Sequence, residues 1–239
     1  MDTQGARPFA ILPEFAALAR RLFDALRDAD HDGVGITRET YAPGETVAMR
    51  RIEAVARQAG LRSAWDAAGN LCITAPGTNP ALPAAACGSH LDSVPQGGNF
   101  DGAAGVIAGL IALLHAARDP GRARTLHLFV LRGEESAWYG RPYLGSSALF
   151  GLFDRAWLAL PNLHAPDLRL GDAMRREGAV PEKLTPGQTL ADPAQLSHFV
   201  ELHIEQGPVM VARKVPVGLV SGIRGNHRHP TARALGEAA

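Results

Sequence analysis

Hydrophobic positions repeat with helical spacing in two segments of the N-terminal part of the chain. The first runs from Leu12 to Leu26, where Pro13 suits the first turn of a helix. The second runs from about Glu45 to Ala59 and stops before Gly60. We therefore expect two amphipathic helices that lead into a sheet.

A turn signal follows these helices. The segment Asp66–Asn70 is rich in Asp, Gly and Asn, and it separates two short runs, Leu61–Trp65 and Leu71–Ala75. We expect these runs to form a hairpin or a strand pair.

Three apolar runs further along the chain each end in ionisable residues, and we expect all three to be strands buried on both faces. The runs and the residues that follow them are Ala84–Cys87 before His90, Thr125–Leu131 before Glu134 and Glu135, and Phe199–Leu202 before His203. Between the first two lies Gly102–Ala117, which is apolar on nearly every side and predicts a buried helix in a β-α-β unit. Because ligands gather beyond the carboxyl ends of the strands in such sheets, the three strand ends indicate one shared site.

Composition narrows the class of partner. The 239 residues are 46% hydrophobic, enough to bury a substantial core, and they carry 24 basic and 24 acidic residues without blocks of like charge. This balance favours a small-molecule partner over a nucleic acid or an anionic membrane. The N-terminus lacks the pattern of a secretory signal, and no stretch has the roughly 20 apolar residues of a membrane span. The two cysteines are typical of reduced, packed thiols. We therefore expect a cytoplasmic protein.

The loop after the first of these strands holds two candidate metal ligands, His90 and Asp101, separated by glycines that permit close backbone approach to an ion. Asp101 opens the following helix, where the dipole favours its ionised form and its capacity to bridge two cations. Asp92 is better placed to orient the His90 imidazole than to bind metal. The alternative is a hydrogen-bonded His90–Asp92 pair at the strand end, with Asp101 only capping a helix.

Glu134 and Glu135 are adjacent carboxylates at the end of a strongly apolar strand. Two like charges in a desolvated site require compensating cations, which metal ions would supply. Since consecutive side chains point in different directions, one glutamate could bind metal while the other removes a proton from metal-bound water. The alternative is a solvated pair on a loop.

His203 supplies a second imidazole, and Gln206 lies three residues further on as a neutral donor and acceptor. This mixed nitrogen and oxygen set suits Zn, Mn, Co or Ni. A bridging carboxylate would hold two such divalent ions roughly 3.5–4 Å apart around a nucleophilic hydroxide. The identity of the metal stays open.

Four segments, in order, resemble one known family. They are Gly88–Pro95, Gly97–Gly102, Gly133–Trp138 and Glu201–Pro208. They are similar to the allantoate amidohydrolases, N-carbamoyl-L-amino-acid hydrolases and β-ureidopropionases of the dinuclear aminoacylase and glutamate-carboxypeptidase superfamily. The resemblance spans nearly the whole chain and implies an α/β catalytic domain with a central mixed, largely parallel sheet flanked by helices.

The resemblance also implies roles for the candidate residues. One metal would be held by His90, Asp101 and His203, and the second by Asp101 and Glu135, with Asp101 as the bridge. Glu134 would be the general base. The substrate-contacting positions of the family match Gln206 and Asn226.

A histidine at position 203 is typical of the carbamoyl-hydrolysing branch, which favours ureido substrates over peptides. We therefore expect hydrolysis of a linear C–N bond in an N-carbamoyl-L-amino acid, allantoate or a related ureido compound. The alternatives are a dipeptidase or N-acyl amino acid hydrolase of the same superfamily, or an inactive metal-binding fragment.

The C-terminus departs from the family pattern. Family members continue through a lid domain and return to the catalytic domain with a last metal-binding histidine. We expect residues 1–220 to be the N-terminal part of the catalytic domain and residues 221–239 to begin the crossover into a missing lid. The full-length parent would be a homodimer through that lid.

Overall fold

The computed structural model describes residues 12–222. The chain divides into two units, residues 1–204 and 205–239, and the described part of the second holds one short helix, α6 (Val209–Ala212). The expected domain division, residues 1–220 and 221–239, stays a prediction. None of the described helices combines the length and apolarity that crossing a lipid bilayer requires.

A five-stranded sheet forms the centre of the first unit, with the strand order β1-β2-β4-β3-β5. The strands are β1 (Arg62–Trp65), β2 (Leu71–Ala75), β3 (Ala84–His90), β4 (Leu126–Leu131) and β5 (Leu196–Val200). The β1–β2 hairpin and the β2–β4 pair are antiparallel, whereas β3 is parallel to both β4 and β5. The sheet is therefore mixed, as expected, and its parallel pairs meet at β3.

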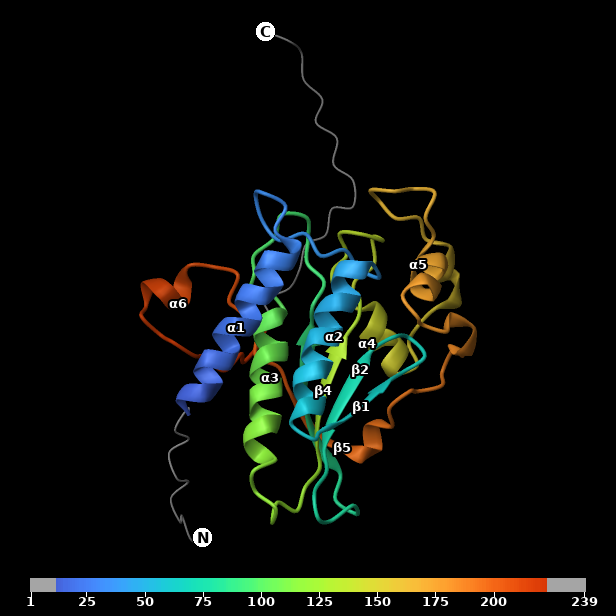
Figure 1. Ribbon diagram of the computed structural model, residues 1–239. Helices are drawn as coiled ribbons and strands as arrows, with labels where there is room; N and C mark the ends of the chain where they lie inside the picture. The colour runs from blue at the N-terminus through green and yellow to red at the C-terminus, as the bar shows by residue number, and fades with distance from the viewer. Residues whose placement is uncertain (1–11, 223–239) are drawn as a thin grey trace. The chain divides into compact units, whose positions relative to one another are not determined.

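Three long helices lie side by side over one face of the sheet (Figure 1). They are α1 (Pro13–Asp30), α2 (Pro43–Gln58) and α3 (Ala103–Ala116). The remaining helical elements of the first unit are α4 (Leu144–Leu149) and α5 (Leu170–Arg176), with 3-10 turns at Arg155–Ala159, Pro181–Lys183 and Pro193–Gln195. The three helices expected from periodicity are thus present, and α3 connects β3 to β4 as the expected β-α-β unit.

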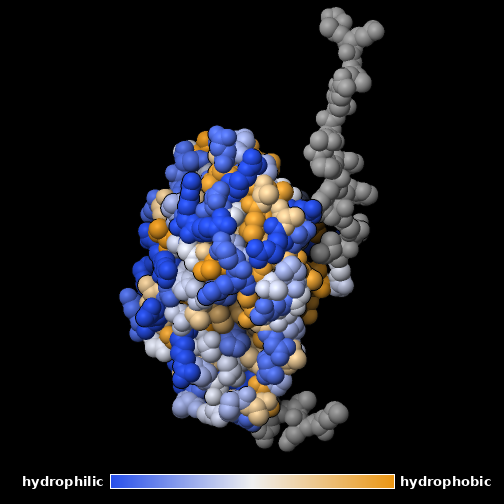
Figure 2. Space-filling view, turned by 90° about the vertical axis from the view of Figure 1, so that its right-hand side faces the viewer, coloured by the Kyte–Doolittle hydropathy of each residue, from blue (hydrophilic) through white to orange (hydrophobic). Residues whose placement is uncertain are grey.

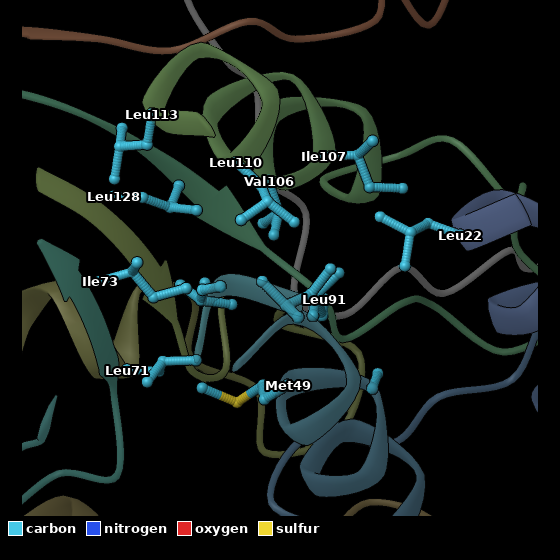
Figure 3. Packing of buried hydrophobic residues seen from close by; sticks show 14 of the residues in the cluster. Leu22, Met49, Leu71, Ile73, Leu91, Val106, Ile107, Leu110, Leu113 and Leu128 are labelled. Atoms are coloured by element: carbon cyan, nitrogen blue, oxygen red, sulfur yellow. The ribbon is translucent and has the colours of Figure 1, made fainter. Parts of the chain in front are cut away.

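The main core lies between these three helices and the sheet (Figure 3). Strand residues alternate between the faces: Leu128 and Val130 belong to this core, while Phe129 packs with Leu149 of α4 in a separate cluster. A Cβ on Gly109 would lie 2.7 Å from Leu128 Cδ1, so glycine permits the close approach of α3 to the sheet without displacing this side chain. On the face shown in Figure 2, hydrophilic and hydrophobic residues are interspersed.

The prediction for the third apolar run was wrong in two respects. The strand ends at Val200 rather than Leu202, and its apolar side chains are exposed, with Phe199 at 43% and Val200 at 60%. The physical reason is position: within residues 12–222, β5 pairs with β3 alone and is an edge strand. Consequently His203 follows the strand in an irregular segment.

Candidate metal centre

Parallel pairing brings the ends of β3 and β4 to the same edge of the sheet, since His90 is in register with Leu131. The chain then turns sharply at Gly133, whose φ of +59° is a left-handed conformation that favours glycine. A Cβ there would lie 2.8 Å from Thr40 Cγ2. This turn carries Glu134 back toward His90.

Asp101 reaches the same place from the N-terminus of α3. Gly102, which follows it, has a φ of +63°, and a Cβ on Gly102 would lie 2.6 Å from His90 Nε2. Only a glycine allows the backbone to pass this close to the imidazole. The glycine-containing loop thus places the Asp101 carboxylate beside His90.

His203 joins the group through a segment that packs against both β3 and α3. Glu201 accepts a hydrogen bond from Ser89 Oγ at 2.6 Å, and a Cβ on Gly105 would lie 2.5 Å from the carbonyl oxygen of Leu202. His203 Nε2 lies 3.3 Å from Asp101 Oδ1. The role of Glu201 in anchoring this segment was not predicted, although Glu201 lies within the fourth motif.

The five residues predicted as ligands and base therefore lie together. Two groups of donor atoms, each within 4.8 Å, could hold a metal ion: His90 with Asp101 and His203, and His90 with Glu134 and Glu135. His90 Nε2 is 3.7 Å from Glu134 Oε2 and 4.0 Å from Asp101 Oδ1. His90 is common to both groups.

His90 is the most buried of these side chains, at 1% exposed. Its Nδ1 lies 2.9 Å from the carbonyl oxygen of Asp92 and 3.2 Å from Oδ1 of the same residue, so Nδ1 carries the hydrogen. Its Nε2 is buried and has no hydrogen-bond partner in the described part of the chain. A buried imidazole nitrogen that faces carboxylates and receives no hydrogen bond is a suitable ligand for a metal cation.

The charges around His90 also favour a cation at this site. Burial lowers the pKa of His90, but Asp92, Glu134 and Glu135 outweigh it and raise that pKa to about 9. Burial, partly offset by His90, raises the pKa of Glu135 to about 7, and it also raises the pKa of Glu134. The carboxylates thus favour a positive charge at His90, where a metal ion would compete with the proton.

Asp92 does more than the sequence indicated. It is fully buried, and besides pairing with His90 it accepts hydrogen bonds from the backbone amides of Glu134 and Glu135 at 3.1 Å each. Thr40 Oγ1 donates to it at 2.5 Å. Asp92 therefore orients the imidazole and also holds the segment that bears both glutamates.

Two predicted substrate contacts remain predictions. Gln206 belongs to the second unit, and Asn226 lies outside the described residues. A further feature, not predicted from the sequence, is the ion pair of Glu45 and Arg132, whose side chains are both 0% exposed.

No family model matches the chain. N-carbamoyl-L-amino acid amidohydrolase of Geobacillus stearothermophilus is 36% identical over 193 residues, 80% of this chain and 46% of that protein. Allantoate deiminase 2 of Glycine max is 28% identical over 212 residues, 87% of this chain and 43% of that protein. A solved hydantoinase/carbamoylase family amidase from Burkholderia ambifaria matches with a TM-score of 0.68 and 28% identity, covering 82% of this chain and 47% of that chain.

These matches confirm the resemblance that the four motifs predicted. The structural match confirms the α/β class with a mixed sheet flanked by helices. The chain spans about half the length of the relatives that it matches.

Proposed function

We propose that this chain, as a relative of the N-carbamoyl-L-amino-acid amidohydrolases, carries the metal-binding and general-base part of a hydrolase that cleaves linear ureido C–N bonds. The observation that supports this most is the buried His90 Nε2, which has carboxylates within 4.0 Å but no hydrogen-bond partner among residues 12–222. The names of the relatives suggest the substrate class: N-carbamoyl-L-amino acids, allantoate or a related ureido compound.

His90, Asp101 and His203, whose donor atoms lie within 4.8 Å of one another, would hold one divalent ion. By the motif resemblance, Asp101 and Glu135 would hold the second ion. When bound, such ions polarise a carbonyl group and lower the pKa of water. Zn, Mn, Co and Ni all suit the donor set. Donor geometry alone does not separate ligand from base, because both glutamates lie near His90; the motif resemblance assigns Glu135 as the ligand.

Glu134 would be the general base that removes a proton from the attacking water. Its carboxylate is partly exposed, at 32%, and burial raises its pKa, which makes it a stronger base than an exposed glutamate. It would take a proton from the attacking water and return it to the leaving nitrogen after the carbonyl carbon has been attacked. With an N-carbamoyl amino acid the products would be the amino acid, ammonia and carbon dioxide.

The test is metal analysis of the purified chain combined with assays of an N-carbamoyl-L-amino acid, allantoate and a dipeptide. Glu134→Gln should retain metal and lower kcat by about 10²–10⁴-fold, the usual contribution of a general base. Glu182→Gln, at a residue half-exposed on the surface and paired with Arg175, is the matched control and should leave kcat unchanged. Full turnover by Glu134→Gln would show that another group is the base.

Two outcomes would favour other functions. Turnover of the dipeptide alone would support the peptidase or N-acyl amino acid hydrolase alternative and reject the inference from His203. Bound metal without any turnover would support the alternative of an inactive metal-binding fragment. For a full-length parent we propose a homodimer, to be checked by its solution mass.

A further inference from the structure

Two buried carboxylates from different parts of the chain hold the segment that bears Glu134 and Glu135. The Gly133 amide donates to Glu45 Oε1 at 3.1 Å, and the next two amides donate to Asp92 at 3.1 Å each. Three consecutive amides therefore end on carboxylates, which are stronger acceptors than carbonyl groups. Glu45 is neither a proposed ligand nor the proposed base.

The carbonyl groups of the same segment are fixed from the other side. The carbonyl oxygens of Arg132, Gly133 and Glu134 accept from the amides of Gly145, Leu144 and Tyr143 at 2.8, 2.9 and 3.0 Å, respectively. These donors lie at the beginning of α4. The segment is thus held between α4 and the two carboxylates. Among the described residues that make these contacts, Glu45 is the only one that belongs to α2.

Glu45 is fully buried in the first turn of α2, so its charge needs partners. Its Oε2 lies 2.8 Å from Arg132 Nη1 and accepts from the Tyr41 amide at 2.7 Å. Arg132 is equally buried and also donates to the carbonyl oxygen of Gly69 and to Thr46 Oγ1. The ion pair therefore joins the beginning of α2 to the end of β4.

We propose that Glu45 is a positioning residue for Glu134, a role that rests on the proposed function of Glu134 as the general base. By holding the Gly133 amide, the Glu45 carboxylate sets the direction in which the following side chains leave the end of β4. A glutamine at position 45 would keep one acceptor oxygen but turn an NH₂ group toward donors. At least one of the N–H groups of Tyr41, Gly133 and Arg132 would then lose its acceptor.

The first measurement is hydrogen exchange of the peptide covering residues 132–136, which requires neither metal nor substrate. Glu45→Gln should speed its exchange by about tenfold or more, the factor that corresponds to losing one charge-assisted hydrogen bond. Equal exchange in Glu45→Gln and the wild-type chain would overturn the proposal.

Glu53→Gln is the matched control. Glu53 lies on the same helix, is 6% exposed, pairs with Arg50 and accepts from Ser63 and Trp65. Within the described part of the chain, the hydrogen bonds of Glu53 go to residues outside 132–136. Glu53→Gln should therefore leave the exchange rate of the 132–136 peptide unchanged. A similar acceleration in both variants would indicate a merely structural role for Glu45.

The second measurement is turnover. In Glu45→Gln we expect kcat to fall about tenfold or more while KM stays within about twofold, because the base is misplaced but the substrate contacts remain. If the wild-type chain hydrolyses no ureido compound, the proposed function fails, while hydrogen exchange still decides the role of Glu45. If Glu45→Gln folds poorly, Glu45→Asp replaces it as the test. This variant keeps the charge but shortens the side chain by one methylene, and it should speed exchange in the 132–136 peptide.

Discussion

Replacing Asp92 by asparagine should weaken both the fold and the metal centre. The Asp92 carboxylate accepts from Thr40 Oγ1 and from the amides of Glu134 and Glu135, and it lies 3.2 Å from His90 Nδ1. Asparagine keeps one acceptor oxygen and replaces the other with an NH₂ group. The side chain is 0% exposed, so water does not replace a lost partner.

The magnitude follows from the partners that remain. One of the two backbone amides loses a charged acceptor, which costs about 1.5–3 kcal/mol in the free energy of unfolding. The Thr40 hydroxyl can rotate and accept from the new NH₂ group, so it adds little. In a chain of this size each kcal/mol lowers Tm by about 2–4 °C, which gives a decrease of about 3–12 °C.

Metal affinity should fall as well, by about 10–100-fold, because Asp92 orients the imidazole of His90. The assay is competition titration with Zn²⁺ or Co²⁺ alongside thermal unfolding of the metal-free chain. Glu53→Gln, which also disrupts a buried set of hydrogen bonds, should lower Tm without changing metal affinity by more than about twofold. If the two variants bound metal as tightly as the wild type, Asp92 would not orient a metal ligand.

Two further predictions concern the same centre. The free energy of unfolding of the metal-free chain should decrease from pH 5 to 9, because the folded state holds extra protons: the pKa of His90 rises from 6.5 to about 9 and that of Glu135 from 4.5 to about 7. Urea unfolding at several pH values checks this, and His90→Gln should make the decrease above pH 7 smaller, because the contribution of His90 is lost. Gly102→Ala should lower both Tm and metal affinity, because the new Cβ would lie 2.6 Å from His90 Nε2. Gly140→Ala is the control: Gly140 has a φ of +69° and open space around it, so this variant should lower Tm alone.

The elements that could be predicted from the sequence are those whose burial is encoded locally. Residues 102–117 are apolar on nearly every side, which predicted a buried helix, and α3 is indeed packed between its neighbours and the sheet. The turn residues Asp66–Asn70 likewise predicted a hairpin or strand pair, which is the β1–β2 hairpin. The apolar runs placed His90 after β3 and Glu134 and Glu135 after β4, where parallel register brings the strand ends together.

Features that depend on distant partners could not be predicted. Phe199 and Val200 form an apolar run that is typical of a buried strand, yet their exposure depends on which elements cover β5. Glu45 stands in the first turn of an amphipathic helix, where an acidic residue is usually solvated and favoured by the dipole. Its partner Arg132 is 87 residues away in the sequence, and no local pattern indicates that the two are buried together.

The fold supports the two histidine ligands of the proposed metal centre unequally. His90 is 1% exposed at the end of β3, which has neighbours on both sides, and its imidazole is oriented by Asp92. His203 is 38% exposed and follows the edge strand β5. Because preorganised ligands lose less conformational entropy on binding, His90, Asp92 and the segment held by Glu45 form the rigid side of the centre. The geometry at His203 depends instead on the contacts of Glu201 and Leu202 with β3 and α3.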